Sequence, residues 1–339
     1  MKSMKYKTRN DDFIITRAPM RITLAGGGTD VTWYSKIHGG RWISAAIDKY
    51  VYVNIKKNVD SKILIVNDVK YKNIDKSSNE FEKVIFACLK MAGISRGLEI
   101  VIDSDIPPSS GLGGSGALEV GLLYALHKYK KINISKYNLA EKAAKIEIDI
   151  LKKPVGPQDQ FIAAYGGIRN FSVNKRGKVN VFDLVLKDAV IKTLEQNLLF
   201  FATGIVKDTN KILGSIRKRS MSNREKLNQF DLFNNIKQIG LKIRQALLTG
   251  DVDKVGHYFH QHWLLKKRLS NQISNKLIDQ WYNEALKNGA QGGKIMGAGG
   301  GGWFVFYVNK KHSIFINKLE KSGLKHENMK FDWEGVKCL

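Results

Sequence analysis

Cysteine is scarce in this chain of 339 residues, and its two cysteines, Cys88 and Cys338, lie far apart. They offer neither a disulfide framework nor the spacing of a metal site, and they suit a reducing compartment. No apolar run is long enough to span a bilayer, and the segment 1–17 has no apolar core like that of a signal peptide. We therefore expect a cytoplasmic protein, a monomer or homodimer, with no membrane partner.

Acidic residues are also few, 31 against 56 lysines and arginines, so the formal net charge is +25. Clustered basic residues would indicate nucleic-acid binding, because they neutralise phosphates. Here the lysines are scattered and the basic runs are short, as at Lys128–Lys131 and Arg217–Arg219. We therefore expect no nucleic-acid partner, and an RNA-binding protein stays the alternative from another functional class. A positive field would still concentrate anions such as ATP and sugar phosphates.

Hydrophobic periodicity predicts strands and helices in separate groups along the chain. Strands gather at both ends of helical blocks, which indicates an α+β fold. The predicted strands are Phe13–Thr16, Arg21–Ala25, Ile43–Ile55, Ile63–Val66, Leu98–Ile102, Leu198–Ala202, a strand–glycine–strand unit at Lys294–Val308 and a last strand near Lys330. The predicted helices are Glu80–Met91, Ala117–Tyr129, Ser135–Leu151, long stretches from Asn223 to Lys287, and a short helix before the last strand.

A glycine-rich segment lies between the predicted strand Leu98–Ile102 and the helix that begins near Ala117. Successive glycines let backbone N–H groups point into one concavity, and the helix that follows adds the positive end of its dipole. The segment is therefore predicted to bind phosphate. Ser115 can cap this helix or bind a phosphate-bound metal through its hydroxyl. The predicted phosphate-binding residues are Pro108, Ser109, Ser110, Gly111, Leu112, Gly113, Gly114, Ser115 and Gly116.

Other nucleotide-binding loops do not fit this segment. Gly111, Gly113 and Gly116 satisfy G-x-G-x-x-G, but a segment with two prolines separates them from the strand, and no acidic residue follows at the distance a dinucleotide fold requires. The chain also lacks the G-K-[ST] of a Walker A loop and the H-R-D and D-F-G of protein kinases. A flexible loop without a ligand is the alternative, but it poorly explains why so many small residues stand at the start of a helix.

Glu147 is unusual within the predicted helix Ser135–Leu151. On a helical wheel it falls on the apolar side, with Ala140, Ala143 and Leu151. A carboxylate there is costly unless a cation compensates it. Either a bound Mg²⁺ or a buried lysine or arginine would do so.

Two other groups of residues are candidates for a site. Asp159 lies in the segment Gly156–Gln160, where the flanking residues predict a shaped turn, and a merely turn-forming aspartate is the alternative. His257, His260 and His262 share one predicted helix, but no Asp or Cys lies suitably near. Surface-exposed or substrate-facing histidines are therefore a better interpretation than a metal site.

Three glycine-containing blocks, in order along the chain, resemble the motifs of GHMP kinases. The block Arg17–Asp30 resembles the first motif in its sugar-kinase form, Pro107–Ala117 the second and Lys294–Gly302 the third. The sequence departs from the family where Gly114 and Gly116 replace the commoner Ser and Ala. The resemblance implies an α+β fold with a mixed α/β domain at residues 1–185, a ferredoxin-like domain at residues 186–339, and ATP between them.

The resemblance also implies roles for individual residues. Asp159 is expected to accept the proton of the sugar hydroxyl, and Arg21 to hold Asp159 and neutralise charge. Ser115 and Glu147 are expected to coordinate Mg²⁺. Positioning and charge neutralisation outweigh proton abstraction in phosphoryl transfer, because its transition state is loose. The residues expected to bind the acceptor are Arg21, Gly28, Thr29, Asp30, Asp159, Gly299 and Gly300.

Within this family, several segments are more similar to bacterial D-glycero-D-manno-heptose 7-phosphate kinases than to galactokinases. They are Ala25–Asp30, Tyr34, Gly39–Gly40, Ile47–Tyr52 and His260–Ser270. This similarity implies ATP-dependent phosphorylation of the anomeric hydroxyl to give a 1,7-bisphosphate, for the activated heptose of lipopolysaccharide or capsule. A fucokinase or galactokinase type of sugar-1-kinase is the alternative. The phosphate of the substrate itself would need cations, for which Lys266–Arg268 and Arg41 are both candidates.

Overall fold

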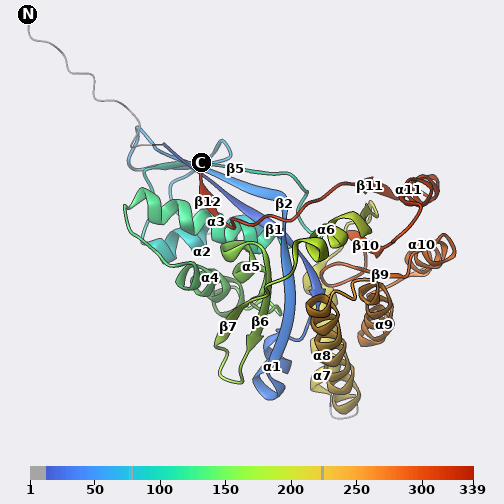
Figure 1. Ribbon diagram of the computed structural model, residues 1–339. Coiled ribbons are helices and arrows are strands. Elements are labelled where there is room, and N and C mark those ends of the chain that lie inside the picture. The colour runs from blue at the N-terminus through green and yellow to red at the C-terminus, as the bar shows by residue number, and fades with distance from the viewer. Residues whose placement is uncertain (1–12, 76, 78, 223–224) are drawn as a thin grey trace, which may run out of the picture.

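The computed structural model of the chain describes residues 13–339 except 76, 78 and 223–224. Residues 1–12, which include most of the segment 1–17 considered for a signal peptide, therefore lie outside the described residues. The same holds for residues 223–224, the first two of the helical stretch predicted from Asn223. Two β-sheets organise the described part, one toward each side of the molecule in Figure 1. No described helix is both long and apolar enough to cross a bilayer.

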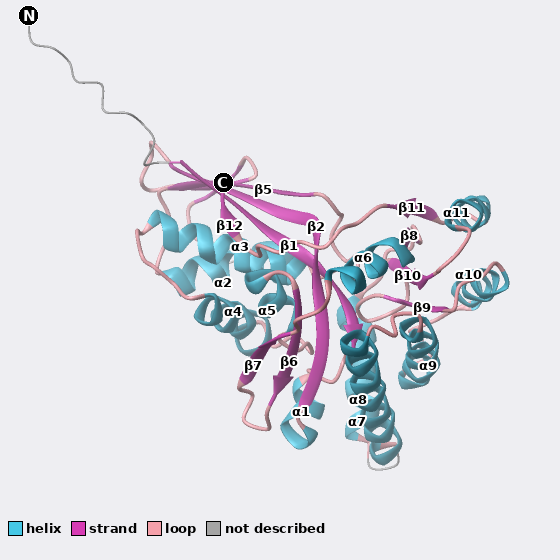
Figure 2. Cartoon of the chain, in the orientation of Figure 1, coloured by secondary structure: helices cyan, strands magenta, loops and turns pink. Residues whose placement is uncertain are grey.

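The larger sheet has eight strands. Its main path runs in the order β12-β1-β2-β5-β3-β4, while β6 pairs with β2 and β7 with β6. All pairs are antiparallel except β3 with β5. The helices α2 to α5 gather beside this sheet, in the left half of Figure 2. The strands are β1 (Phe13–Ala25), β2 (Gly40–Lys57), β3 (Leu64–Val66), β4 (Val69–Tyr71), β5 (Leu98–Ser104), β6 (Ile168–Val173), β7 (Val179–Asp183) and β12 (Lys337–Cys338), and the helices are α1 (Thr32–His38), α2 (Glu80–Ala92), α3 (Gly114–Tyr129), α4 (Lys136–Lys145) and α5 (Gln158–Tyr165).

Strand β1 differs from the prediction of two short strands. It is one strand of 13 residues, and its pairing with β2 shifts register between Pro19 and Met20. Proline has no N–H to donate to a neighbouring strand, so it is tolerated where a bulge interrupts the ladder. The continuous strand places Arg21 and Thr23 in the middle of the fold.

The predicted helix Ser135–Leu151 is also different in detail. It begins as predicted, with the Ser135 side chain accepting a hydrogen bond from the N–H of Asn138, but α4 ends at Lys145. A π-helical turn, η1 (Ile146–Ile150), follows and carries Glu147. Such turns accommodate an extra residue and are frequent at functional sites.

The smaller sheet is antiparallel, in the order β11-β8-β10-β9. In chain order its strands and helices follow a β-α-β-β-α-β pattern, with several helices in the first crossover, which is a ferredoxin-like topology. The α+β prediction is confirmed, whereas the division at 185/186 stays a prediction. The elements are α6 (Asp188–Asn197), β8 (Leu198–Ala202), α7 (Thr209–Met221), α8 (Lys226–Thr249), α9 (Lys254–Leu269), α10 (Lys276–Lys287), β9 (Gly292–Ile295), β10 (Trp303–Tyr307), α11 (His312–Lys321) and β11 (Lys325–Glu327).

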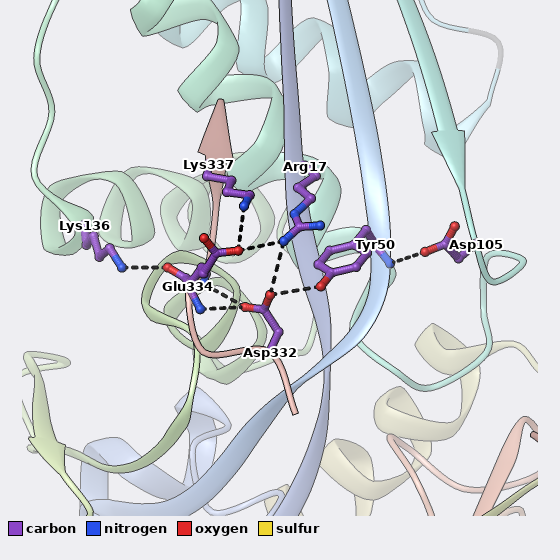
Figure 3. Close-up of polar contacts among 8 residues, drawn as sticks. Arg17, Tyr50, Asp105, Lys136, Asp332, Glu334 and Lys337 are labelled. Carbon is purple, nitrogen blue, oxygen red and sulfur yellow. Dashed lines mark hydrogen bonds and ion pairs between the residues drawn. The ribbon is translucent and has the colours of Figure 1, made fainter. Parts of the chain in front are cut away.

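After β11 the chain returns to the larger sheet, where β12 pairs with β1. A polar network shown in Figure 3 fixes this return. Arg17 donates to Glu334 at 2.7 Å and lies 4.3 Å from the centre of the Tyr50 ring, while the Tyr50 hydroxyl donates to Asp332 at 3.0 Å. The predicted last strand near Lys330 is a single bridge between Ile47 and Phe331. The network therefore braces the strand that also carries Arg21.

Candidate active site

The phosphate loop is held between strand β1 and helix α3. The backbone N–H of Arg21 in β1 donates to the carbonyl of Leu112 at 2.8 Å, and Gly113 precedes the first turn of α3 with a φ of 81°. Further along, the Thr16 hydroxyl donates to the carbonyl of Gly121 at 2.9 Å, which ties α3 to β1. The positive end of α3 therefore lies at the loop, where it favours an anion.

Gly116, one of the two departures from the family motif, has a specific packing role. A Cβ atom on Gly116 would lie 2.6 Å from the Cβ of Asp159 and 3.1 Å from the backbone nitrogen of Gln160. A Cβ on Gly114 would meet only the end of Met20, at 3.5 Å. The absence of a side chain at Gly116 thus lets α3 and α5 approach closely, which brings Asp159 to the phosphate loop.

Arg21 and Asp159 form a bidentate ion pair. The Nε and Nη2 atoms of Arg21 lie 2.8 and 2.9 Å from the two carboxylate oxygens of Asp159. The Nη1 atom of Arg21 donates to the carbonyl of Gly111 in the phosphate loop. Asp159 lies in the first turn of α5, not in a separate turn as predicted. The structure therefore brings together the two residues for which the resemblance implied a catalytic role.

Asp30 lies beside this pair and is almost fully buried. Its Oδ2 accepts a hydrogen bond from the N–H of Gln158 at 3.4 Å, while its Oδ1 has no partner among the described residues. Burial, together with the nearby Asp159 carboxylate, raises the pKa of Asp30 to about 6. A buried carboxylate oxygen without a donor is suited to accept a hydrogen bond from a sugar hydroxyl.

Glu147 is buried, as its position on the helical wheel predicted. Its Oε1 accepts hydrogen bonds from the Ser115 hydroxyl at 2.8 Å and from Lys153 at 3.1 Å. The Lys153 contact is a buried ion pair, one of the two compensations expected for this carboxylate. The adjacent carboxylate and hydroxyl oxygens of Glu147 and Ser115 also fit Mg²⁺, which prefers one or two carboxylates and the oxygens of substrate phosphates.

Glu119 is a second buried carboxyl near this position that the sequence analysis missed. The amide of Gln160 donates to Glu119 Oε2 at 2.9 Å and to Glu147 Oε2 at 2.8 Å. Burial and the charge of Glu147 raise the pKa of Glu119 well above its usual range. The signal was present in the sequence, because Glu119 is the one acidic residue in the apolar run Ala117–Leu123.

A pocket lies between the larger sheet and the helices of the C-terminal part. Thr23, Gly28 and Gln158 line one side, and His262, Lys266 and Lys294 line the other together with Met296, Gly297 and Ala298. The Thr23 hydroxyl donates to the Gln158 side chain at 2.9 Å. Because Gln158 directly precedes Asp159, the pocket adjoins the Arg21–Asp159 pair.

The remaining candidates for acceptor binding occupy different positions. Gly28 lines the pocket, but the Thr29 hydroxyl is bonded to the carbonyls of Gly26 and Arg41, both at 2.8 Å, and so stabilises the turn. Gly299 lies against Ile273 and Gly300 against Ile212 and Gln272, and the pocket lining does not include these two glycines. Of the third glycine block, the structure thus places residues 294–298 in the pocket lining.

The three histidines of α9 do not form a metal site. His260 lies 2.9 Å from the Tyr282 hydroxyl, and His262 is buried in the pocket lining. No group of three or more His, Cys, Asp or Glu side chains in the described part of the chain is arranged to hold a metal ion. His262 therefore lines the pocket.

Comparisons with known proteins agree with this geometry. A family model described as GHMP kinases N terminal domain matches residues 79–167, and one described as GHMP kinases C terminal matches residues 243–319. The D-glycero-alpha-D-manno-heptose 7-phosphate kinase of Campylobacter jejuni is 30% identical over 337 residues, which cover 96% of this chain and 98% of that protein. The galactokinase of Pyrococcus furiosus is 25% identical over 348 residues, which cover 95% of each chain.

A solved structure shares the fold over nearly the whole chain. The crystal structure of a D-glycero-D-manno-heptose 1-phosphate kinase from Bacteroides thetaiotaomicron superposes with a TM-score of 0.78 at 23% identity, covering 96% of this chain and 98% of that one. The assignment to one family rests on the two family models and on the Campylobacter relative, and the fold agrees with it. The chain belongs to the GHMP kinases, and within them it is similar to sugar kinases.

Proposed function

We propose that this protein transfers the γ-phosphoryl group of ATP to the anomeric hydroxyl of D-glycero-D-manno-heptose 7-phosphate, which yields the 1,7-bisphosphate. The observation that carries the proposal is the bidentate pair of Arg21 and Asp159 beside the phosphate loop. This pair places a carboxylate, held in one orientation, next to a loop suited to bind phosphate.

The residues of the loop and of η1 would hold the nucleotide and its metal. Backbone N–H groups of residues 108–116 and the N-terminus of α3 are suited to the phosphates of ATP. Glu147 and Ser115 would hold Mg²⁺, which would neutralise the charge of the phosphates. The contact with Lys153 holds the Glu147 carboxylate in place when no metal is bound.

Asp159 would orient the anomeric hydroxyl and accept its proton as the new P–O bond forms and the bond to the leaving ADP breaks. Arg21 fixes the carboxylate of Asp159 and neutralises charge near the transferred group, and Asp30 would hold another sugar hydroxyl through its unpaired Oδ1. An anomeric hydroxyl is more acidic than an ordinary alcohol. Alignment and charge neutralisation therefore contribute more here than base strength does.

The choice of acceptor is supported by the similarity to the Campylobacter heptose 7-phosphate kinase and by the sequence between Ala25 and Tyr52. The product would feed the synthesis of nucleotide-activated heptose for lipopolysaccharide or capsule in the cytoplasm. The comparable similarity of galactokinases and of a fucokinase domain keeps another sugar-1-kinase as the alternative.

A substrate panel tests the proposal. Purified protein with ATP and Mg²⁺ is given heptose 7-phosphate, free heptose, galactose, fucose or mannose, and phosphorus NMR identifies the product. We expect the highest kcat/KM for heptose 7-phosphate, with the new phosphate on the anomeric oxygen. Equal or better turnover of galactose would contradict the heptose assignment. No turnover of any sugar, with retention on RNA at increasing salt, would favour the RNA-binding alternative.

A further inference from the structure

Three lysines near the pocket have no carboxylate partner among the described residues. Lys207 donates to the carbonyls of Met296 and Gly301 at 3.0 and 3.1 Å. Lys266 donates to the carbonyls of Ile295 and Gly297 at 2.8 and 2.6 Å, and Lys294 to that of Leu24 at 3.0 Å. Lys294 also lies 3.2 Å from a ring nitrogen of His262 and 4.3 Å from the centre of the Phe259 ring. None of these partners carries a full negative charge.

His262 completes this group. It is buried, its Nδ1 lies 3.2 Å from the Nζ of Lys294, and its Nε2 has no partner in the described structure. A buried polar atom that faces a pocket without a partner is costly unless a ligand satisfies it. His262, Lys266 and Lys294 all line the same pocket.

Buried cations are normally compensated, and elsewhere in this site they are. Arg21 pairs with Asp159, and Lys153 with Glu147. Carbonyl dipoles stabilise an ammonium group less than a full negative charge does. The position of Lys266 and Lys294 in a pocket lining therefore indicates that the missing negative charge belongs to a ligand.

We propose that Lys266, Lys294 and His262 form the subsite for the phosphate that the acceptor sugar already carries, at the end remote from its reacting hydroxyl. The inference rests on the proposed function, since it assigns a position to one part of the proposed substrate. Phosphate oxygens accept charge-assisted hydrogen bonds from ammonium groups, and the Nε2 of His262 can add a further donor.

The location favours the phosphate of the sugar over those of the nucleotide. None of the phosphate-loop residues 108–116 lines this pocket, whereas Thr23, Gly28 and Gln158 do. Lys207, by contrast, lies at the loop itself, since a Cβ on Gly111 would come within 2.5 Å of its Nζ, and it does not line the pocket. We therefore separate Lys207 from the subsite.

The other cations considered from the sequence lie elsewhere. Lys267 pairs with Asp279 at 3.0 Å, and neither it nor Arg268 is in the pocket lining. Arg41 is exposed and borders a separate hollow with His38 and Lys237, which shares no residue with the pocket. Of the basic residues that the sequence singled out for this phosphate, only Lys266 lines the acceptor pocket.

Protonation gives the subsite a measurable signature. Burial, and then the charge of Arg21, lower the pKa of Lys266 to about 7. The charged and titratable groups that face it are Arg21 on β1, Lys207 before α7, Lys294 on β9 and His262 on its own helix. A phosphate dianion favours the protonated lysine, so binding at pH 8 should take up a proton, and affinity should fall as pH rises above about 7.

The experiment compares wild type with Lys266→Met and Lys294→Met, and uses Lys267→Met as the matched control. Each variant removes one ammonium group and keeps an unbranched side chain. We measure kcat/KM for heptose 7-phosphate and for free heptose and take their ratio. We expect the ratio to fall about 10- to 100-fold in Lys266→Met and Lys294→Met, with little change in Lys267→Met. Calorimetry at pH 8 in buffers of different ionisation enthalpy should show proton uptake with heptose 7-phosphate, lost in Lys266→Met.

Other outcomes overturn the inference, each in a different way. If kcat/KM falls equally for both substrates, the lysines only support the third glycine block, Lys294–Gly302. If the KM for ATP rises instead, they serve the nucleotide. If wild type does not turn over heptose 7-phosphate, the proposed function fails, and inorganic phosphate then tests the site by calorimetry. Proton-linked binding of inorganic phosphate that Lys266→Met abolishes would keep the anion site without the proposed substrate, whereas no such binding would remove both.

Discussion

The active site has one side rich in carboxylates and one rich in lysines, here called the acidic and the basic side, and their buried charges are compensated differently. On the side built by β1, α3, η1 and α5, the two carboxylates next to the phosphate loop have cationic partners within the protein, Asp159 with Arg21 and Glu147 with Lys153. On the side built by α9 and β9, Lys266 and Lys294 contact carbonyls, a histidine and the Phe259 ring, and no carboxylate among the described residues. Asp159 and Glu147 are therefore compensated without ligands, whereas the proposed subsite on the basic side would gain its compensating charge from a bound phosphate.

The difference suits the chemistry of a sugar kinase. Both substrates of the proposed reaction are anionic, and the protein brings few carboxylates near them that are not already neutralised. Positive charge that is not neutralised internally attracts such substrates and stabilises them once bound. Changes on the acidic side should therefore affect the chemical step, and changes on the basic side the affinity for anions.

The largest effect is expected for Asp159→Asn. Asparagine keeps the size of the side chain and can still accept one bond from Arg21, but the charge that aligns the acceptor is lost. We expect kcat to fall by roughly two to four powers of ten with the KM for ATP almost unchanged. Steady-state kinetics measure both values, and circular dichroism controls for the fold. Turnover like that of wild type would remove Asp159 from the mechanism.

Glu147→Gln separates the two explanations for the burial of this carboxylate. If Glu147 binds Mg²⁺, the Mg²⁺ concentration needed for half-maximal activity should rise about 10- to 100-fold. If Glu147 serves only the ion pair with Lys153, the variant should lose about 3 kcal/mol of unfolding free energy without a shift in Mg²⁺ dependence. Activity titrations with Mg²⁺ and urea denaturation give the two readouts.

Lys153→Met is the matched control for this prediction, because it removes the partner and keeps the carboxylate. Lys153 competes with Mg²⁺ for the same oxygen, so its removal should lower the Mg²⁺ requirement if Glu147 is a ligand. An unchanged requirement in both variants would exclude Glu147 from the metal site.

Gly116→Ala tests how closely α3 and α5 must approach. The added methyl group would lie 2.6 Å from the Cβ of Asp159, so α5 must move. A small displacement of an aligned catalytic group is costly, and we expect kcat to fall about tenfold. Gly114→Ala is the control, since its methyl group makes only an ordinary contact with Met20. Equal activity of the two variants would show that the close approach of the helices is not needed for catalysis.

The features that could be predicted from the sequence are those that depend on a local pattern of residues. The strand at Leu198–Ala202, the helix from Glu80 and the α+β class follow from periodicity and helix ends, and these predictions are confirmed. The burial of Glu147 was predicted because a helix fixes which residues share a face. Glycine density and the following helix likewise identified the loop that Arg21 and Leu112 anchor.

What the sequence could not predict depends on contacts between distant segments. The surroundings of Lys207 and Lys294 became apparent only once the segments they contact were placed. The sequence marks Glu119 as an acidic residue in an apolar run, but it does not reveal that Gln160 is its partner. The π-helical turn at Ile146–Ile150 was not predicted, because apolar periodicity over so few residues does not distinguish a π turn from an α-helix. The roles assigned to individual site residues remain predictions that the variants above test.

Asp30→Asn is expected to have the smallest effect on the protein as a whole, although it should weaken sugar binding more than ATP binding. Burial raises the pKa of Asp30 from 3.8 to about 6, so between these values the folded state binds more protons than the unfolded state, and stability falls as pH rises. Above pH 6 the ionised group costs up to about 3 kcal/mol.

Asparagine carries no charge, and its amide group can occupy the position of Oδ1, which has no partner in the described structure, while its oxygen keeps the bond from Gln158. Asp30→Asn should therefore be about 1–3 kcal/mol more stable than wild type at pH 8 and nearly equal to it at pH 4, as measured by urea denaturation. In wild type, kcat/KM for the sugar should fall as pH drops through about 6, because a protonated Asp30 accepts a hydrogen bond from the sugar hydroxyl more weakly than the carboxylate does. A stability difference that does not change with pH would show that the charge of Asp30 is compensated in the folded protein. Asp30 would then join Asp159 and Glu147 as carboxylates compensated within the protein, and the contrast with the lysines of the basic side would be sharper still.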